Sequence, residues 1–446
     1  MPLTRRDLLL ASLFGSGALG LRALATGIPA AFLTNPRTAL ADETCGAKDK
    51  AQFVIFSTSG SGDPINTNCP GTYFGDPGVP QGLYHPPNAS MAATQLQIAG
   101  KTWTAAAPWA QIPQASLDRT QFWHIMTNTP VHAAEREVLE LNGGTMHNEL
   151  FPSVLASSLA PCLGTLQPQP IALASTPLYF NGQALPLLPP FALKYLVGPL
   201  KDGLNTAQLQ QMRDDTMNKI HAFYRTSATP AQQAYIDKMA NTRGQWRNVQ
   251  QGPLATLANI PNGHAGADAQ IQAAIALIQM KLSPVIAIDI PFGGDNHSDP
   301  NLGKEVSTTT DTTGVSGVSA IASLMKQLGT AGLSDQVSFV SLNVFGRTLA
   351  TNGSTPVSDG RNHNANHQVS IAIGKPFRGG VIGGLGPVEG DFGAVSISSS
   401  TGAPGGDIQP IDTLGAFAQT MLSAFGIDPT SISNFPTAKP ITSVLA

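Results

Sequence analysis

Four polar loops of this 446-residue chain carry side chains that bind metals or move protons. Carboxylate oxygens and imidazole nitrogens that converge from separate loops suit a divalent metal ion. Such an ion would polarise an ester oxygen and stabilise the charge that develops as the bond breaks. Taken singly, each loop also fits an ordinary turn with a solvated histidine. The candidates, loop by loop, are Asp63 and Asn66; Asp295, His297 and Asp299; Asn343 and Arg347; and Asp359, Asn362, His363 and His367.

Each of the first three loops follows a run that reads as a buried strand. Residues 52–56, 285–290 and 337–343 are short, apolar and rich in β-branched side chains. Between the last two runs, residues 315–328 have helical periodicity, and strand, loop, helix, strand is typical of a parallel crossover. Working residues of open α/β sheets gather at the carboxyl ends of the strands. We therefore expect the candidate loops to meet at one edge of a mostly parallel sheet.

The rest of the chain completes an α/β prediction with a helical addition. Residues 206–251 have helical periodicity and read as a helical hairpin, inserted into the domain or capping it. Residues 64–118 are rich in Pro, Gly and Asn and look irregular. Further strands are expected at 121–126, 171–174 and 369–373, and further helices at 133–140, 267–281 and 411–425.

The N-terminus has the pattern of an export signal. Arg5 and Arg6 stand directly before an apolar run at 8–25 that glycines and alanines interrupt. This pattern is typical of a twin-arginine signal, which the export machinery reads as an address. Residues 39–41 offer a small-x-small cleavage site, so we expect residues 42–446 to form the working domain. The alternative is an uncleaved N-terminal anchor. The expected partner during export is the twin-arginine translocase, and the expected location is the periplasm or the medium.

Composition narrows the partners of the mature chain. Only 12% of the residues are charged and the formal net charge is -3, with no basic run to pair with phosphates. Nucleic acid is therefore excluded as a partner. Beyond residue 41, no stretch is long and apolar enough to span a bilayer. We expect no stable membrane span after cleavage.

Three cysteines allow at most one intramolecular disulfide bond. Cys45 and Cys69 both lie in loop-rich sequence near the mature N-terminus, and we expect them to pair with each other. Cys162 would then be the spare thiol. The spacing of the three fits no zinc-binding pattern.

With these residues considered, the chain resembles a family of twin-arginine-exported bacterial proteins, the domain-of-unknown-function family fifteen-zero-one. That family is similar to the alkaline phosphatase and sulfatase superfamily. The resemblance implies an alkaline-phosphatase-like fold in which a central, mostly parallel sheet is flanked by helices. It rests on segments matching in order: 54–56 with Gly60-Ser61-Gly62-Asp63-Pro64-Ile65-Asn66-Thr67; Asp295-Asn296-His297; 331–337; Phe345-Gly346-Arg347-Thr348; Gly360-Arg361-Asn362-His363; and 424–429.

The chain departs from the family at two candidate ligand positions. Asn343-Val344 stands where the family has Ser-Glu, and Asn362 stands where it has the Asp of an Asp-His pair. Asparagine offers a carbonyl oxygen without charge, and valine offers no ligand. The resemblance therefore implies a reduced site. Its ligands to one divalent metal are expected to be Asp63, Asp295, His297 and His363, with Asn66, Asn343, Arg347, Asn362 and His367 as weaker ligands or supporting residues.

Other candidate groups are less well placed. Of the remaining histidines, only His132 and His147 are kept in reserve, and the others are expected to be structural. Hydrolases of the superfamily use a Ser, Thr or modified Cys nucleophile. Thr129 and Thr145 lie in suitable places, but neither belongs to a recognisable motif, so no nucleophile is assigned.

Two classes of function are consistent with this sequence. The first is an exported, metal-dependent hydrolase that acts on a small phosphate or sulfate ester. The second is a non-catalytic member that serves as a binding or assembly partner of a periplasmic protein. The lost carboxylates favour the second, and the surviving aspartates and histidines favour the first. A purely structural surface protein would be the third reading if the candidate loops lay far apart.

Overall fold

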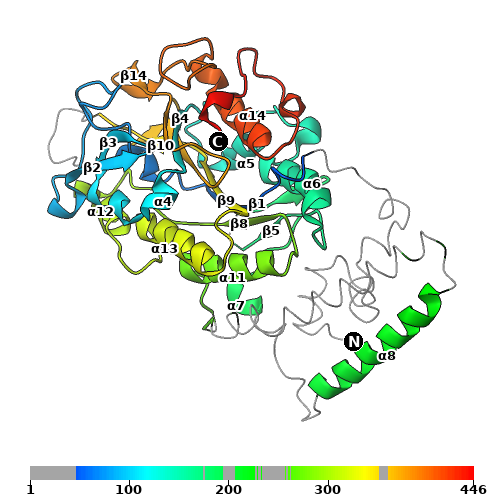
Figure 1. The fold of residues 1–446 in the computed structure, drawn as a ribbon. Helices are drawn as coiled ribbons and strands as arrows, with labels where there is room; N and C mark the ends of the chain where they lie inside the picture. The colour runs from blue at the N-terminus through cyan, green and yellow to red at the C-terminus, as the bar shows by residue number, and fades with distance from the viewer. Residues whose placement is uncertain are drawn as a thin grey trace.

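A seven-stranded sheet forms the centre of the computed structural model, which describes residues 47–173, 176–193, 206–226, 263–350 and 360–446, with isolated positions 229, 233, 257, 260 and 261 (Figure 1). All strands but β12 run in the same direction, because only β12 pairs antiparallel with its neighbours β9 and β4. The strands, in spatial order, are β13 (Gly380–Ile382), β4 (Thr120–Ile125), β12 (Gln368–Ile373), β9 (Val337–Asn343), β1 (Phe53–Ser59), β8 (Val285–Ile288) and β5 (Ile171–Ala172).

Strand β1 is the middle of the parallel part of the sheet. It pairs with β9 on one side and β8 on the other, with Val54 opposite both Val285 and Ser338. Every residue of β1 and β9 is buried. Strands covered on both faces carry near-continuous apolar runs rather than alternating ones. That burial explains why the sequence marks these strands so clearly.

Helices cover both faces of the sheet and enclose two apolar cores (Figure 1). One face packs against α11 (Ala267–Gln279) and α13 (Gly317–Thr330), whose small and branched side chains belong to the larger core. The other face packs against α6 (Phe151–Leu163) and α14 (Thr413–Ala424), which share the second core. Burial on two faces is the usual way in which a mostly parallel sheet is stabilised.

Most of the other elements are short, and the exception among the described residues is α8, with 20 residues. The remaining strands form two-stranded ribbons, and the remaining helices are mostly single turns. They are β2 (Ala93–Ile98) with β3 (Lys101–Ala106), β6 (Tyr179–Phe180) with β7 (Gln183–Ala184), β10 (Gly346–Arg347) with β11 (His363–Asn364), β14 (Leu385–Val388) with β15 (Asp391–Ala394), and α4 (Gln114–Leu117), α5 (Glu135–Leu139), α7 (Pro190–Leu193), α8 (Thr206–Arg225) and α12 (Gly303–Thr309).

The predicted α/β class and mostly parallel sheet are confirmed, and so is the crossover through α13. The prediction that residues 64–118 are irregular is wrong, because β2 and β3 form a six-residue-paired hairpin there. Helix α6 was not predicted from the sequence. In the predicted hairpin at 206–251, α8 is a helix, and most of the segment from its end to residue 251 lies outside the described residues. The export signal at 1–41 and the candidate Asp359 lie outside them as well.

The predicted disulfide between Cys45 and Cys69 is wrong. Cys69 is a free thiol with no exposed surface, packed in the larger core. Cys162 is the cysteine that is disulfide-bonded. The 3-10 turn Pro64–Thr67, just before Cys69, is also buried, and the spacing of the cysteines does not reveal this.

No helix in the described ranges combines the length and apolar character that crossing a membrane requires.

Two fully buried histidines form a hydrogen-bonded pair between the ends of β4 and β12. His124 Nε2 donates to the carbonyl of Pro70 at 3.1 Å, so its Nδ1 must accept from His367 Nε2 at 2.9 Å. His367 Nδ1 then accepts from Asn66 Nδ2 at 3.1 Å. This chain of donors is satisfied only if both rings are neutral. Burial lowers the pKa of His124 to about 4 and that of His367 well below its usual value.

The histidine pair predicts a loss of stability in acid. Below about pH 6.5 these histidines are protonated in the unfolded chain but stay neutral in the folded protein, where their pKa values are lower. The free energy of unfolding therefore falls as the pH drops towards 4. Each such histidine adds a slope of about 1.4 kcal/mol per pH unit in that window. We expect His124→Gln to reduce this slope in denaturant titrations at pH 4.5 to 7.5. His147→Asn, at an exposed position, should leave it unchanged. Equal slopes for His124→Gln and the wild type would contradict this account.

Candidate metal centre

Asp295 is the meeting point of three imidazoles and one guanidinium. It lies in the loop after β8, and its Oδ2 is 3.3 Å from Nε2 of both His132 and His297. Its Oδ1 is 3.6 Å from His363 Nε2 and 2.8 Å from Arg347 Nη2. Side chains from separate loops therefore converge at the carboxyl edge of the sheet, as strand order in an open α/β sheet predicts.

Backbone carbonyls orient two of these imidazoles. His132 Nδ1 lies 2.7 Å from the carbonyl oxygen of Gly60, and His363 Nδ1 lies 2.6 Å from that of Pro130. A carbonyl only accepts, so each Nδ1 carries a proton, and in the neutral form of the ring each Nε2 presents its lone pair towards Asp295. The buried Nε2 of His132 has no hydrogen-bond partner among the described residues. An imidazole held through one nitrogen by a carbonyl, with the other nitrogen free, is the usual arrangement of a metal ligand.

The atoms of a candidate metal site can thus be named. Ligand atoms of His132, Asp295 and His363 all lie within 4.8 Å of one another. Two imidazole nitrogens and one carboxylate oxygen match three-ligand catalytic zinc sites, which keep a fourth position for water or substrate. The side chains of His132 and Asp295 are each 38% exposed and that of His363 is 26% exposed, so the group opens to solvent.

Phe345 fixes the planes of the two oriented imidazoles. Its fully buried ring stacks on His363 with centroids 4.5 Å apart and lies tilted against His132 at 4.9 Å. Gly62 provides the room for this ring: it has a φ of +60°, and a Cβ there would meet Phe345 at 2.0 Å. The Ser-Gly-Asp segment after β1 is thus shaped around an aromatic support for the centre.

The β10–β11 ribbon brings Arg347 to the centre, because it pairs Arg347 directly with His363. The Arg347 side chain is completely buried. Burial alone would raise the pKa of Asp295, but the Arg347 guanidinium outweighs this and holds that pKa below its usual value. Burial, followed by the charge of Arg347, lowers the pKa of His363. The carboxylate therefore stays ionised and the imidazole stays neutral, which are the forms that bind metals.

Asp63 and His297 were predicted as metal ligands, and both lie outside this convergent group. Asp63 is buried, and its Oδ1 accepts from the backbone N–H groups of Phe292 and Gly294, at 2.9 and 2.8 Å. It thereby shapes the loop that carries Asp295. His297 contacts Asp295, but its side chain is 51% exposed.

The predicted supporting residues lie around the centre. Asn66 Nδ2 donates to the carbonyl of Arg347, and Asn66 Oδ1 accepts from the N–H of Arg347, both at 2.8 Å. The same Nδ2 also donates to His367 Nδ1. Asn343 ends β9, and its backbone N–H donates to Gln368. Asn362 is exposed, and its backbone pairs with Thr348. His367 is not one of the three residues whose ligand atoms converge.

His132 is a member of the convergent group that was not predicted as a ligand from the sequence and was only held in reserve. It belongs to a single 3-10 turn, His132–Ala134, that no strand pattern marks. Its partners Gly60 and Asp295 are 72 and 163 positions away in the chain. Only the folded order of the strands brings them together. The one available signal was its place in the loop after the predicted strand 121–126.

Partly buried carboxylates lie directly behind the centre. Glu135 Oε1 accepts from the hydroxyls of Thr58 and Thr176, at 3.0 and 3.1 Å, and its other oxygen would lie 2.8 Å from a Cβ at Gly60. Burial, with Asp63 adding, raises the pKa of Glu135. Burial, then the charges of Asp63 and Glu135, raises the pKa of Asp289 to about 7. Where they are ionised, these carboxylates add negative charge to the region behind His132.

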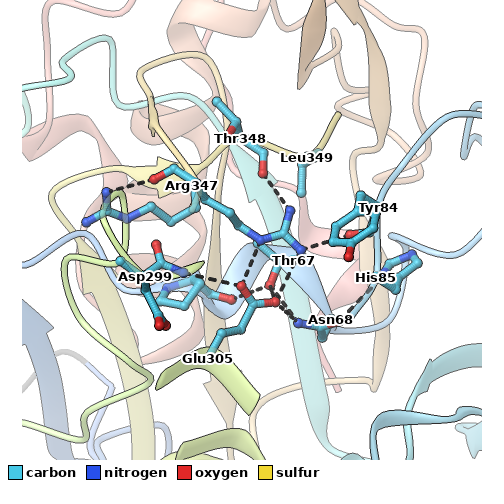
Figure 2. Close-up of polar contacts among 12 residues, drawn as sticks. Thr67, Asn68, Tyr84, His85, Asp299, Glu305, Arg347, Thr348 and Leu349 are labelled. Carbon is cyan, nitrogen blue, oxygen red and sulfur yellow. Dashed lines mark hydrogen bonds and ion pairs between the residues drawn. The ribbon is translucent and has the colours of Figure 1, made fainter. Parts of the chain in front are cut away.

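A second buried ion pair ties the loops of the centre together. Arg361 Nε donates to Glu305 Oε2 at 2.7 Å, and neither side chain is more than 2% exposed. Figure 2 shows Glu305 surrounded by its other donors, which include Thr67 at 2.8 Å and Asn68. Arg361 also donates to the carbonyls of Thr348 and Tyr84, each at 2.8 Å. Because the charges are paired and hydrogen-bonded, they are tolerated without solvent.

Close backbone packing completes this connection. Gly360 has a φ of +77°, and a Cβ there would lie 2.0 Å from the carbonyl oxygen of Asn296. The same carbonyl accepts from the N–H of Arg361 at 3.3 Å. The segment that leads to His363 is thereby packed against the segment that carries Asp295 and His297. The spacing of the candidate ligands depends on this contact.

The chain matches no model of a known protein family, and no match was found among curated proteins or solved structures. The function of the centre must be inferred from its own residues.

The Glu305–Arg361 pair predicts a large stability effect. Glu305→Ala leaves a buried guanidinium uncompensated, which costs about 3–5 kcal/mol in the free energy of unfolding. Denaturant titration measures the loss. The matched control is Asp335→Asn in the exposed pair of Arg119 and Asp335, whose ions lie 2.6 Å apart. Exposed pairs contribute about 0–1 kcal/mol. Similar losses for the two variants would show that Glu305 does not hold the loops.

Proposed function

We propose that this protein is an exported, metal-assisted ester hydrolase with an alkaline-phosphatase-like fold and a single metal ion. The observation that carries the proposal is the convergence of His132 Nε2, His363 Nε2 and the Asp295 carboxylate, with both imidazoles turned by backbone carbonyls. The mostly parallel sheet with helices on both faces is compatible with that fold. The family resemblance at 295–297 and 360–363 supports the substrate class, phosphate or sulfate esters.

Each residue has a distinct task in this proposal. His132 and His363 would supply neutral nitrogen ligands, and Asp295 would supply the anionic oxygen. A divalent ion held by them would act as a Lewis acid on the ester. Arg347 keeps Asp295 ionised and fixed, and Phe345 keeps the imidazole planes in place. Preorganisation of this kind avoids rearrangement during the reaction.

A non-catalytic binding or assembly protein is the second candidate. It is favoured by the replacements at 343, 344 and 362. Val344 is fully buried and has no side-chain atom that could bind a metal, and Asn362 is exposed to solvent. A single-metal site does not need these positions, because its three ligands come from elsewhere. The hydrolase therefore remains the preferred proposal.

Metal binding and hydrolysis should fail together in ligand variants. We expect about one zinc-class ion per folded wild-type chain, and ester hydrolysis that chelators abolish and metal restores. His363→Ala and His132→Ala should weaken metal binding by more than ~10-fold, since even changes to residues behind the ligands cost that much. Metal analysis and a chromogenic ester screen measure both properties.

The control for these variants is His147→Asn, at an exposed position outside the centre. It should bind metal and turn over substrate like the wild type. A wild-type protein that binds one ion but hydrolyses no ester would favour the binding protein. A protein that binds no ion at all would contradict both the metal and the hydrolase.

Export is proposed to depend on the paired arginines. Replacing them conservatively in R5K/R6K keeps the charge but removes the pattern that the twin-arginine machinery reads. We expect the full-length variant to remain in the cytoplasm, whereas the wild type appears in the periplasmic fraction with residues 1–41 removed. Cell fractionation with N-terminal sequencing checks this. Unchanged export of R5K/R6K would contradict the proposed route.

A further inference from the structure

The guanidinium of Arg347, which reaches Asp295, is buried, and four of its five N–H groups point at protein acceptors. Arg347 Nε donates to the carbonyl of Gly62 at 2.6 Å, and Nη2 donates to that of Ser61 at 2.7 Å and lies 2.8 Å from Asp295. Its Nη1 donates to the carbonyl of Arg361 at 3.4 Å. The side chain has no exposed surface. It positions the centre but cannot clamp a phosphate in the way that accessible arginines do.

The charges behind the centre oppose a second negative charge on the substrate. The Glu135 carboxylate lies against Gly60, whose carbonyl accepts from the metal-ligand candidate His132. Asp63 is close enough to act electrostatically on Arg347, Glu135 and Asp289. When all of them are ionised, a divalent ion, Arg347 and the carboxylates of Asp295, Asp63, Glu135 and Asp289 have a formal net charge of −1. A negative field from fixed carboxylates extends over several ångströms in a partly buried site.

We propose that the centre selects esters that carry one negative charge, such as phosphodiesters and sulfate monoesters, over phosphate monoester dianions. This inference rests on the proposed hydrolase function. One anionic oxygen can be neutralised at the metal position. A second one cannot reach Arg347, whose side chain has no exposed surface, and it meets the negative charge of the carboxylates behind the centre. Net charge at a site sets such preferences through the local potential.

The reaction is hydrolysis at phosphorus or sulfur. The oxygen of water bonds to that atom, and the ester bond to the leaving oxygen breaks with its electron pair. A proton from the water goes to the leaving oxygen. The products are an alcohol and a phosphate monoester or inorganic sulfate, so no oxidant, reductant or other co-reactant is needed.

The test uses the metal-loaded mature protein, residues 42–446, at pH 8. It compares three chromogenic esters with the same nitrophenol leaving group. The esters are bis(4-nitrophenyl) phosphate, 4-nitrophenyl sulfate and 4-nitrophenyl phosphate. We expect kcat/KM for at least one singly charged ester to exceed that for the phosphate monoester by about tenfold or more, the factor that corresponds to 1.4 kcal/mol. The first two arms distinguish a phosphodiesterase from a sulfatase.

A charge-neutral replacement tests the cause of the selectivity. Glu135→Gln keeps an oxygen that can accept from Thr58 and Thr176 but removes the negative charge. We expect it to reduce several-fold the ratio of kcat/KM for the singly charged esters to kcat/KM for the doubly charged one. Most of this change should come from a higher kcat/KM for the phosphate monoester. The matched control is Asp335→Asn, which removes a charge just before β9, at the opposite edge of the sheet. It should leave the ratio unchanged.

The outcomes separate this inference from the function on which it rests. If no ester is hydrolysed in a metal-dependent way, the proposed function fails. If the phosphate monoester is the best substrate, hydrolysis stands and the charge selection is overturned. An unchanged ratio in a folded Glu135→Gln protein also overturns it. If that variant does not fold, the ratio of the wild type decides alone.

Discussion

The buried guanidinium of Arg347 is the interaction on which the rest of the centre depends. It binds carbonyls of Ser61, Gly62 and Arg361 and meets the carboxylate of Asp295. These partners belong to the loop after β1, the loop after β8 and the segment before β11, and Arg347 itself follows β9, so one cation joins four segments that are distant in sequence. A guanidinium suits this role because its donors point in fixed directions and it stays charged when buried. Its own pKa falls through burial, with Asp295 acting against that fall.

Two further polar systems hold Arg347 and its loops from either side. The chain from His124 through His367 to Asn66 fixes the Arg347 backbone. On the other side, Glu305 and Arg361 connect the segments around Thr67, Tyr84 and Thr348. Buried polar networks are favourable only when nearly every member is satisfied. Because His124, His367, Asn66, Glu305 and Arg361 all find buried partners, the geometry at Asp295 is specified by the fold and not by chance contact of exposed side chains.

The sequence predicted the fold where burial alone determines an element. β1 and β9 are covered on both faces, so their apolar runs are continuous and easily recognised. The β2–β3 hairpin was missed because its outer residues are exposed and polar, which resembles loop sequence. Cys69 was paired wrongly because its place in the apolar core, next to the buried 3-10 turn Pro64–Thr67, is not encoded in the spacing of the cysteines.

Part of the centre was predictable because some of its residues lie next to strands that the sequence marks clearly. Asp295, His363 and Arg347 follow or join recognisable strands, and the structure brings them together. His132 lies in a short turn, and its importance depends on a carbonyl contact with Gly60 that only the folded chain makes. Asp63 looked like a ligand by residue type, yet its Oδ1 is used by two backbone donors. Residue type indicates what a side chain can do, whereas its hydrogen-bond partners decide what it is free to do.

X-ray absorption at the metal edge of the zinc- or cobalt-loaded protein tests the central claim most directly. The account predicts about two imidazole nitrogens, at roughly 2.0–2.1 Å, and carboxylate or water oxygen completing a coordination number of about four. The imidazole signal should fall by about half in the residual metal-bound fraction of His363→Ala. A coordination shell made only of oxygen, or an imidazole signal that is unchanged in both His132→Ala and His363→Ala, would contradict it.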